Sequence, residues 1–262
     1  MNSDLKKTTD IGIVALTVIA CIVAAWFLFH KTSAHPAGLV AAWSGAANGQ
    51  GGSGVVLKNV SLTEGVTGKA FEFNPEKFPY GTYTGVQIPD SPAYALTGSL
   101  SIAGWVRPRG DGYVIFFRGD HRPGLDPYGI SMQANHHLRF QICGASNDQT
   151  AFVDTEIPYG EWTHVAAVLD ARTGDMSLFL NGALAAQTNT TVRPFGPLLA
   201  DQSPGIGIGN LNDGGNTFPF AGDIDGIALY DRALSPEEIQ SAYAANAANA
   251  RGKVEPFPTR RQ

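Results

Sequence analysis

The chain has 262 residues, of which 44% are hydrophobic and only 16% are charged, and its net charge is −5 at pH 7. This length suits one membrane anchor followed by one domain of about 200 residues, large enough to fold without disulfides. No long basic run is present, which argues against nucleic acid as a partner because its recognition needs clustered Lys and Arg. Many glycines and prolines with few charges favour an all-β protein.

The first predicted element is an apolar segment, residues 11–29, that contains no charged residue. As a helix it would nearly span the hydrocarbon core of a bilayer, and Lys6 and Lys7 before it favour an N-terminus inside. We therefore expect a cytoplasmic tail at 1–10, a transmembrane helix at 11–29 and a linker at 30–37. The protein would be a single-pass membrane protein whose domain is extracytoplasmic, in the periplasm or at the cell surface.

Two other interpretations of this segment remain open. Residues 32–34, Thr-Ser-Ala, resemble the cleavage site of a signal peptide, although the apolar core is longer than such peptides usually have. Residues 18–21, Val-Ile-Ala-Cys, resemble a lipoprotein signal, although the chain stays apolar after Cys21. Each alternative would also place the domain outside the cytoplasm.

From residue 38 onward, short apolar segments recur between Gly, Pro, Asn and Asp, which is typical of strands and turns. Asn181-Gly182 predicts a type I′ hairpin, because both residues tolerate positive φ. Residues 162–187 are therefore expected to form a three-stranded meander. The predicted strands lie at 39–43, 55–60, 99–107, 113–118, 138–143, 162–169, 176–181 and 224–230.

One short helix is predicted near the C-terminus. Ser235 is a good N-cap, Pro236 suits the first helical position, and Glu238 completes a capping box. The Pro-rich residues 247–262 are predicted to be a disordered tail, so the folded domain is expected at 38–246.

Seven short motifs resemble, in order, the LamG-like jelly-roll family within the concanavalin A-like lectin/glucanase superfamily. The resemblance covers residues 38–245 and implies an all-β fold of two antiparallel sheets, a jelly-roll sandwich. It also implies binding of a glycan or a cell-surface protein, often with calcium. The motifs are GKAFEF at 68–73, GVQIPD at 85–90, SIAGWV at 101–106, GEWTHVA at 160–166, LFLNG at 178–182, FAGDIDG at 220–226 and LYDRALSPEEI at 229–239.

Two loops, residues 118–128 and 210–216, contain several carboxylates and amides, the oxygen ligands that calcium prefers. The layout is similar to that of pentraxins, whose calcium site joins two such loops. The resemblance implies convergence at one end of the sandwich, although Asn, Asp and Gly are also ordinary turn residues. The expected calcium ligands are Asp120, Asp126, Asn210, Asn212 and Asp213, with Tyr128 and Asn216 as ligand-binding residues.

A second calcium position is implied by related sandwiches at Asp223 and Asp225, which alternate onto one face of a strand. The loop at 44–53 that would complete it contains no acid, so the sequence does not favour this site. Trp105 and Trp162 are expected in the core, and His164, on the face of Trp162, as a buried group with its hydrogen bonds satisfied. Cys143 is expected to be a buried thiol without a disulfide.

Three functions are compatible with these residues. The preferred one is a membrane-anchored binding module for a carbohydrate or another cell-surface ligand. A structural or scaffold protein of the cell envelope, making protein contacts only, is the alternative. A degenerate glycosidase is disfavoured, because the E-x-D-x-x-E arrangement of glucanase relatives is absent and Asp154 and Glu156 look like ordinary polar-face residues. We therefore expect a protein that is not an enzyme.

Overall fold

The computed structural model describes residues 36–45, 55–110, 113–119, 126–145, 149–198, 204–212 and 218–251. The chain divides into two compact units, 1–37 and 38–262, and nearly all described residues belong to the second. Among the described residues no helix is long and apolar enough to cross a membrane. The predicted transmembrane helix at 11–29 lies outside the described residues, so the anchor stays a prediction.

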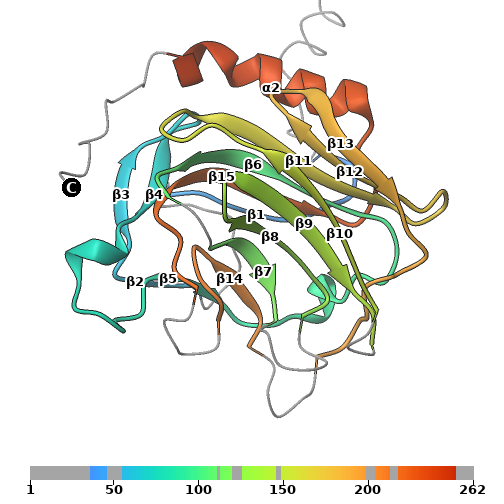
Figure 1. The fold of residues 1–262 in the computed structure, drawn as a ribbon, viewed down its shortest axis with the longest axis horizontal. Helices are drawn as coiled ribbons and strands as arrows, with labels where there is room; N and C mark the ends of the chain where they lie inside the picture. The colour runs from blue at the N-terminus through green and yellow to red at the C-terminus, as the bar shows by residue number, and fades with distance from the viewer. Residues whose placement is uncertain are drawn as a thin grey trace, which may run out of the picture. The chain divides into compact units, whose positions relative to one another are not determined.

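The described residues form two antiparallel sheets that face each other, which confirms the predicted sandwich (Figure 1). The eight-stranded sheet has the order β13-β12-β11-β6-β15-β4-β3, with β1 paired to β15, and the seven-stranded sheet has the order β10-β9-β8-β7-β14-β5-β2. The first contains β1 (Leu39–Trp43), β3 (Ser61–Glu64), β4 (Lys69–Phe73), β6 (Leu100–Pro108), β11 (Thr163–Asp170), β12 (Asp175–Leu180), β13 (Ala183–Asn189) and β15 (Gly222–Tyr230). The second contains β2 (Val56–Lys58), β5 (Gly85–Ile88), β7 (Val114–Arg118), β8 (Tyr128–Gln133), β9 (His137–Cys143), β10 (Thr150–Glu156) and β14 (Ile206–Ile208).

Turn residues fix where the strands begin and end. Asn181 and Gly182 have φ values of 50° and 83°, as a type I′ turn requires, and they join β12 to β13. The predicted meander is therefore confirmed as β11, β12 and β13. Short 3-10 helices, η1 (Pro75–Lys77) and η2 (Pro92–Tyr94), punctuate the connections after β4 and β5.

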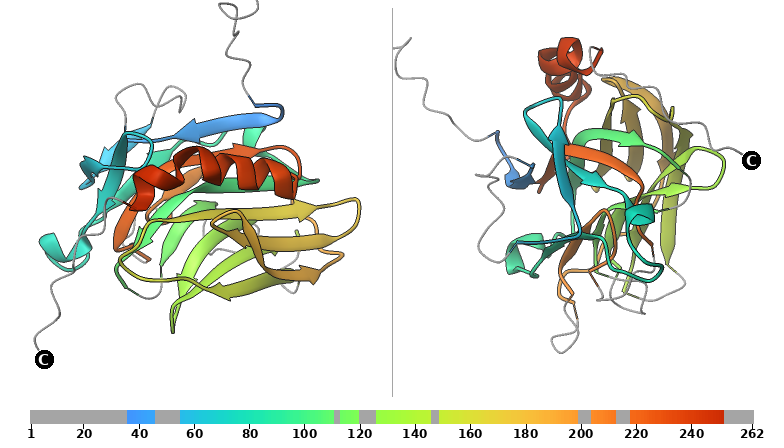
Figure 2. Two further views of the ribbon diagram at one scale, coloured as in Figure 1. Left: turned by 90° about the horizontal axis from the view of Figure 1, so that it is seen from above. Right: turned by 90° about the vertical axis from the view of Figure 1, so that its left-hand side faces the viewer.

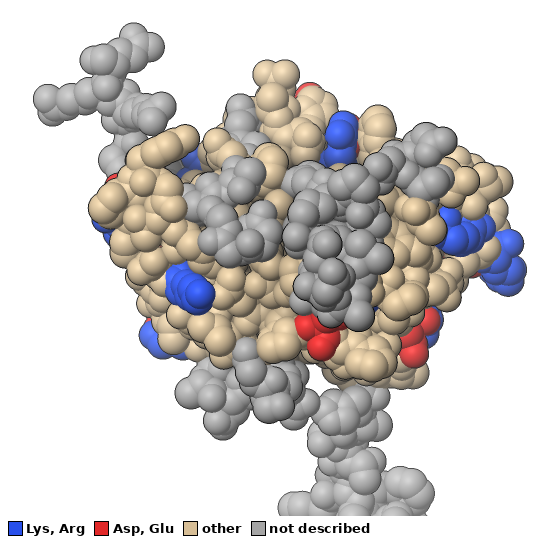
Figure 3. Space-filling view, turned by 90° about the horizontal axis from the view of Figure 1, so that it is seen from below, with Lys and Arg blue, Asp and Glu red and all other residues tan. Residues whose placement is uncertain are grey.

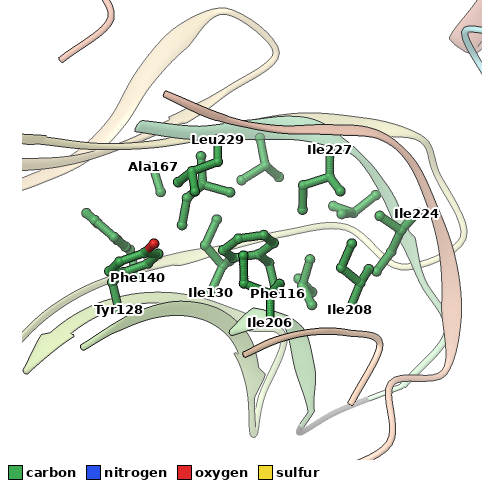
Figure 4. Packing of buried hydrophobic residues seen from close by; sticks show 14 of the residues in the cluster. Phe116, Tyr128, Ile130, Phe140, Ala167, Ile206, Ile208, Ile224, Ile227 and Leu229 are labelled. Carbon is green, nitrogen blue, oxygen red and sulfur yellow. The ribbon is translucent and has the colours of Figure 1, made fainter. Parts of the chain in front are cut away.

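The main core lies between the two sheets. Because side chains alternate along each strand, every second residue points inward, and both sheets contribute branched and aromatic residues to one layer. Figure 4 shows this layer, with Ile224, Ile227 and Leu229 from β15 facing Ile206 and Ile208 from β14.

Among the described residues one α-helix, α2 (Pro236–Arg251), covers part of the outer face of the eight-stranded sheet (Figure 2). The capping box is confirmed: the Glu238 amide donates to Ser235 Oγ at 3.3 Å, and the Ser235 amide donates to Glu238 Oε2 at 2.8 Å. Residues 247–251, predicted as the start of a disordered tail, are helical instead. They are helical because Ala250 is buried and Asn249 donates to the Val66 carbonyl at 3.2 Å.

Trp105 and Trp162 are buried as predicted, but under α2 rather than between the sheets. They pack with Val66, Ala70 and Ala250 in a separate apolar cluster. Alternation explains the position of Trp105, because its place on β6 points away from the central core, and Trp162 lies just before β11 on the same side. The outer face of this sheet is therefore a second, smaller core.

Candidate functional site

Of the two predicted calcium loops the structure describes residues 118–119, 126–128 and 210–212, so their convergence on one ion stays a prediction. Strand β14 runs antiparallel to β7, with Ile206 opposite Arg118 and Ile208 opposite Phe116. The chain turns at Gly209, where φ is 75°, and residues 210–212 fold back over β14. Asn212 therefore reaches Pro204 at the end of the sheet where the chain leaves β7 after Arg118.

Asn210 and Asn212 have structural roles. The fully buried Asn210 donates to the Thr84 carbonyl at 3.1 Å, and its Oδ1 accepts from the amides of Leu211 and Phe218. Asn212 donates to the carbonyls of Ile88 and Pro204. These side chains bind backbone groups of the segment that folds over β14 and of its neighbours, so the described contacts of Asn210 and Asn212 are structural.

Asp126 and Tyr128 lie at the start of β8. Asp126 accepts a contact from the Cys143 thiol at 3.4 Å, and burial together with Asp126 raises the pKa of Cys143 to about 12. Tyr128 is fully buried, and its hydroxyl donates to the Tyr94 carbonyl at 2.7 Å. Tyr128, predicted as a ligand-binding residue, therefore has no exposed surface for a ligand, because alternation along β8 points it into the core. Asp120, Asp213 and Asn216 lie outside the described residues.

The two aspartates of β15 differ. Asp223 is fully buried and accepts from Arg107 Nε at 2.8 Å and Arg109 Nη2 at 2.7 Å, which leaves little for an ion. Asp225 accepts from the Thr67 amide and hydroxyl through Oδ2, but its buried Oδ1 has no partner in the described part of the chain. No group of three His, Cys, Asp or Glu residues suited to a metal occurs in the described ranges.

A different polar surface is formed by the outer side of β8, β9 and β10, which lie side by side in the seven-stranded sheet (Figure 1). The strand registers arrange its side chains in three rows. We call this surface the β8–β10 face, and its rows are Gly129–Gln141–Phe152, Ser131–Arg139–Asp154 and Gln133–His137–Glu156.

A planar ion pair forms the middle of the β8–β10 face. Arg139 donates through Nε to Asp154 Oδ1 at 2.9 Å and through Nη2 to Asp154 Oδ2 at 2.8 Å. The hydrogen bond to Asp154 raises the pKa of Arg139. The guanidinium also lies 4.1 Å from the centre of the Phe152 ring, and 52% of Phe152 is exposed. A flat polar group thus stands beside an exposed aromatic ring.

Several polar atoms of this face have no partner among the described residues. Gln133 donates to Ser131 Oγ at 2.8 Å and Gln141 donates to Cys143 Sγ at 3.8 Å, so each glutamine uses its Nε2 and leaves its carbonyl oxygen open. Arg139 uses Nε and Nη2 and leaves Nη1 open. Donors and acceptors are therefore available together, as a ligand rich in hydroxyl groups requires.

A signal for this face exists in the sequence. The outward positions of the β10 segment TAFVDTE are Thr150, Phe152, Asp154 and Glu156. Phe152 is therefore an aromatic residue among outward positions that are otherwise polar. Alternation alone does not distinguish a ligand-binding residue from an ordinary exposed one. From the sequence alone, Asp154 and Glu156 are therefore interpreted as ordinary residues of the polar face. The pairing of β9 with β10 supplies the missing neighbours, Arg139 and Gln141.

A cavity of about 590 Å³ lies elsewhere, between the outer side of β11–β13 and the start of α2. Its floor is apolar, with Val168, Phe179 and Leu184 among the lining residues. Its rim is charged, but Arg232 is bound to Glu238 by two hydrogen bonds of 2.7 Å. The cavity therefore offers fewer open bonding groups than the β8–β10 face.

Comparisons with known proteins agree with this fold. A family model described as the concanavalin A-like lectin/glucanases superfamily matches residues 80–240, more than half of the chain. Pentraxin-related protein PTX3 of Mus musculus is 30% identical over 135 residues, 49% of this chain and 35% of that protein. The Homo sapiens protein is 28% identical over 148 residues, 54% of this chain and 37% of that protein. The chain thus matches only about a third of the length of these relatives.

Solved structures show the same fold at low identity. The binding domain of Paraclostridial Mosquitocidal Protein 1 has a TM-score of 0.61 at 14% identity, covering 79% of this chain and 52% of that one. Domain 4 of AbnA, a GH43 extracellular arabinanase from Geobacillus stearothermophilus solved with arabinotriose, has a TM-score of 0.53 at 23% identity. That match covers 78% of this chain and 97% of the domain.

Proposed function

Because the chain belongs to the concanavalin A-like lectin/glucanases superfamily, we propose that its sandwich is a binding module for carbohydrate and that the β8–β10 face is the binding surface. The observation that carries the proposal is the exposed Phe152 ring beside the planar Arg139–Asp154 pair. Sugar rings have apolar faces that pack on aromatic rings and hydroxyl groups that pair with planar polar side chains. Arabinotriose bound to a domain of the same fold gives further support.

The experiment is a glycan-array screen of the full chain in detergent, followed by titration of any hit. Phe152→Ala should lower affinity at least about tenfold, equal to about 1.4 kcal/mol. Leu184→Ala is the matched control, because Leu184 is equally exposed, at 53%, but belongs to β13 of the other sheet and lines the cavity beside α2. Absence of glycan binding, or equal effects of the two variants, would contradict the proposal.

The proposal places the module outside the cytoplasm, held by the apolar segment 11–29 with Lys6 and Lys7 inside. Protease added to intact cells should then remove the domain while a tag at the N-terminus stays protected. Protection of the domain with digestion of the N-terminal tag would reverse the topology. Release of the intact domain into the medium would instead favour a cleaved signal peptide.

Calcium assistance is part of the proposal, but at Asp225 rather than at the two loops. The observation that supports this position is that the buried Asp225 Oδ1 lacks a hydrogen-bond partner in the described part of the chain, and a carboxylate oxygen is a ligand that calcium prefers. Gly65 also fits, since a side chain there would begin 2.4 Å from Asp225 Oδ2. Asp225 would hold the ion through Oδ1, and the ion would stabilise the turn between β3 and β4.

We propose that the module does not hydrolyse its ligand. Asp154 and Glu156 are the nearest candidates for a catalytic pair, since they share one side of β10. Both Asp154 oxygens already accept hydrogen bonds from Arg139, so Asp154 is not placed to protonate a leaving group. Release of reducing ends from bound glycan, lost in Glu156→Gln, would overturn this part of the proposal.

A scaffold protein that makes only protein contacts is the second candidate. Val56, Leu57 and Leu62, on the edge strands β2 and β3, are all more than two-fifths exposed, and apolar residues grouped on a surface suit a protein partner. This candidate predicts that Leu57→Lys and Leu62→Lys weaken assembly of the cell envelope while Phe152→Ala has no effect.

A further inference from the structure

The charge of the β8–β10 face limits its ligands. Arg139 is the only Lys or Arg on β8, β9 or β10, and its charge is matched by Asp154 at hydrogen-bond distance. Glu156 adds a second, exposed carboxylate without a described partner. An acidic sugar would therefore meet excess negative charge. On another face of the molecule, charged side chains are likewise sparse and scattered (Figure 3).

The length of the face indicates how much of a glycan it contacts. Phe152, Asp154 and Glu156 are successive outward residues, so they extend over roughly 13 Å at about 3.3 Å per residue. This is longer than one sugar ring. Each row offers its own group: the Phe152 ring, the Arg139–Asp154 pair, and Glu156 beside His137.

A second aromatic element stands beyond the third row. The His136 ring stacks on Tyr159 with centroids 3.9 Å apart and planes 11° apart. It is placed there because the Ile157 amide, just after β10, donates to the His136 carbonyl at 2.9 Å. His136 is exposed. The face therefore has an aromatic ring near one end, at Phe152, and an aromatic stack at the other.

We propose that this face binds a neutral, linear oligosaccharide of several units, laid along β9 and β10 from Phe152 to His136, and that it excludes acidic glycans. The inference rests on the proposed function, since it concerns the same surface. The chain would contact successive rows as it follows the strands. A single terminal sugar would reach only one row, and its affinity would be low.

The test uses the full chain in detergent with three neutral probe series, arabino-, xylo- and cello-oligosaccharides of one to five units, and oligogalacturonides as the acidic series. At least one neutral series should gain more than about tenfold in affinity between one and four units. His136→Asn, which keeps a residue that tolerates the positive φ of 62°, should weaken the tetramer and leave the dimer unchanged. Glu156→Gln should improve binding of oligogalacturonides.

The outcomes separate the two proposals. If no series binds, and screening finds no other glycan, both fail. If a sugar binds and Phe152→Ala abolishes binding, but affinity does not rise with length or the acidic series is preferred, the proposed function stands and the inference is overturned. Each variant should retain the wild-type melting temperature within about 2 °C, since each changes an exposed side chain.

Discussion

Side chains alternate in the same way along the strands of both sheets, but the outward-pointing residues differ in how far they are buried. On the eight-stranded sheet, outward residues such as Trp105, Val168 and Phe179 are buried, because α2 lies over them. On the seven-stranded sheet, outward residues such as Arg139, Gln141 and Glu156 stay at least partly exposed. The difference teaches that the outer side of one sheet is covered by a helix and adds to stability, whereas the β8–β10 part of the other sheet stays open to solvent even though its neighbour β7 is covered, with Phe117 packed on Leu211.

The largest expected effect on stability comes from weakening the contact between α2 and the eight-stranded sheet. Ile239 of α2 is buried against Ala166, Val168 and Phe179. Ile239→Ala should lower the free energy of unfolding by about 2–4 kcal/mol, because it removes buried methyl groups and leaves a cavity. Phe152→Ala on the open face should cost less than about 1 kcal/mol. Denaturant unfolding measures both, and equal losses would remove the contrast between the two faces.

Acid should lower the free energy of unfolding through His164, which lies on the side of the eight-stranded sheet that α2 covers. Burial between Trp105 and Tyr243 lowers the pKa of His164 to about 4, from an ordinary value of 6.5. The unfolded chain binds a proton at higher pH than the folded one, so stability is full above 6.5 and falls as the pH drops towards 4. The loss is on the order of 3 kcal/mol. His164→Gln should flatten this part of the stability profile; an unchanged profile would exclude His164 as its cause.

Calcium should raise the stability of the protein by binding at Asp225, on the eight-stranded sheet that α2 covers. At a hundred times Kd, an ion that binds only the folded state adds about 2.7 kcal/mol, a rise of roughly 5–10 °C in melting temperature for a domain of this size. Asp225→Asn should abolish the rise, and Asp126→Asn should leave it intact. The reverse result would return the ion to the loop before β8, and no rise in either protein would exclude calcium altogether.

The smallest effect on stability is expected at the ion pair of the open face. Arg139 and Asp154 are each 27% exposed, so Asp154→Asn should cost less than about 1 kcal/mol of stability. Its effect on glycan affinity should be larger, roughly tenfold, because Arg139 loses the partner that orients it. Asp170→Asn breaks the exposed pair with Arg172 and serves as the control. A loss of affinity in both variants would indicate a general effect of charge.

Much of the fold could be predicted from local sequence. Asn181-Gly182 and Ser235-Pro236 fixed a hairpin and a helix start, because turn and cap chemistry depends only on neighbouring residues. Strand β8, Tyr128–Gln133, was not predicted, since its segment was assigned in part to a polar loop. The length of α2 was also underestimated, because its last turn is held by Val66, a residue far away in the sequence.

Little of the candidate site could be predicted, for the same reason. Asp126 and Asn210 looked equivalent as loop residues, but Asn210 is buried and bonded to backbone groups, whereas Asp126 accepts from the Cys143 thiol. Arg139 and Phe152 are thirteen positions apart and become neighbours through the register of β9 and β10. The sequence also predicted that the hydrogen bonds of buried His164 would be satisfied, whereas its Nδ1 has no partner in the described part of the chain.

The three rows of the β8–β10 face have a consequence for how this module could diversify. Leu138 and Phe140 on β9 point into the core, whereas His137, Arg139 and Gln141 between and beside them point out. The residues that would touch a ligand are thus separate from those that hold the fold. Outward positions can be exchanged by single substitutions with little loss of stability, so the same frame can acquire a new sugar preference in laboratory evolution.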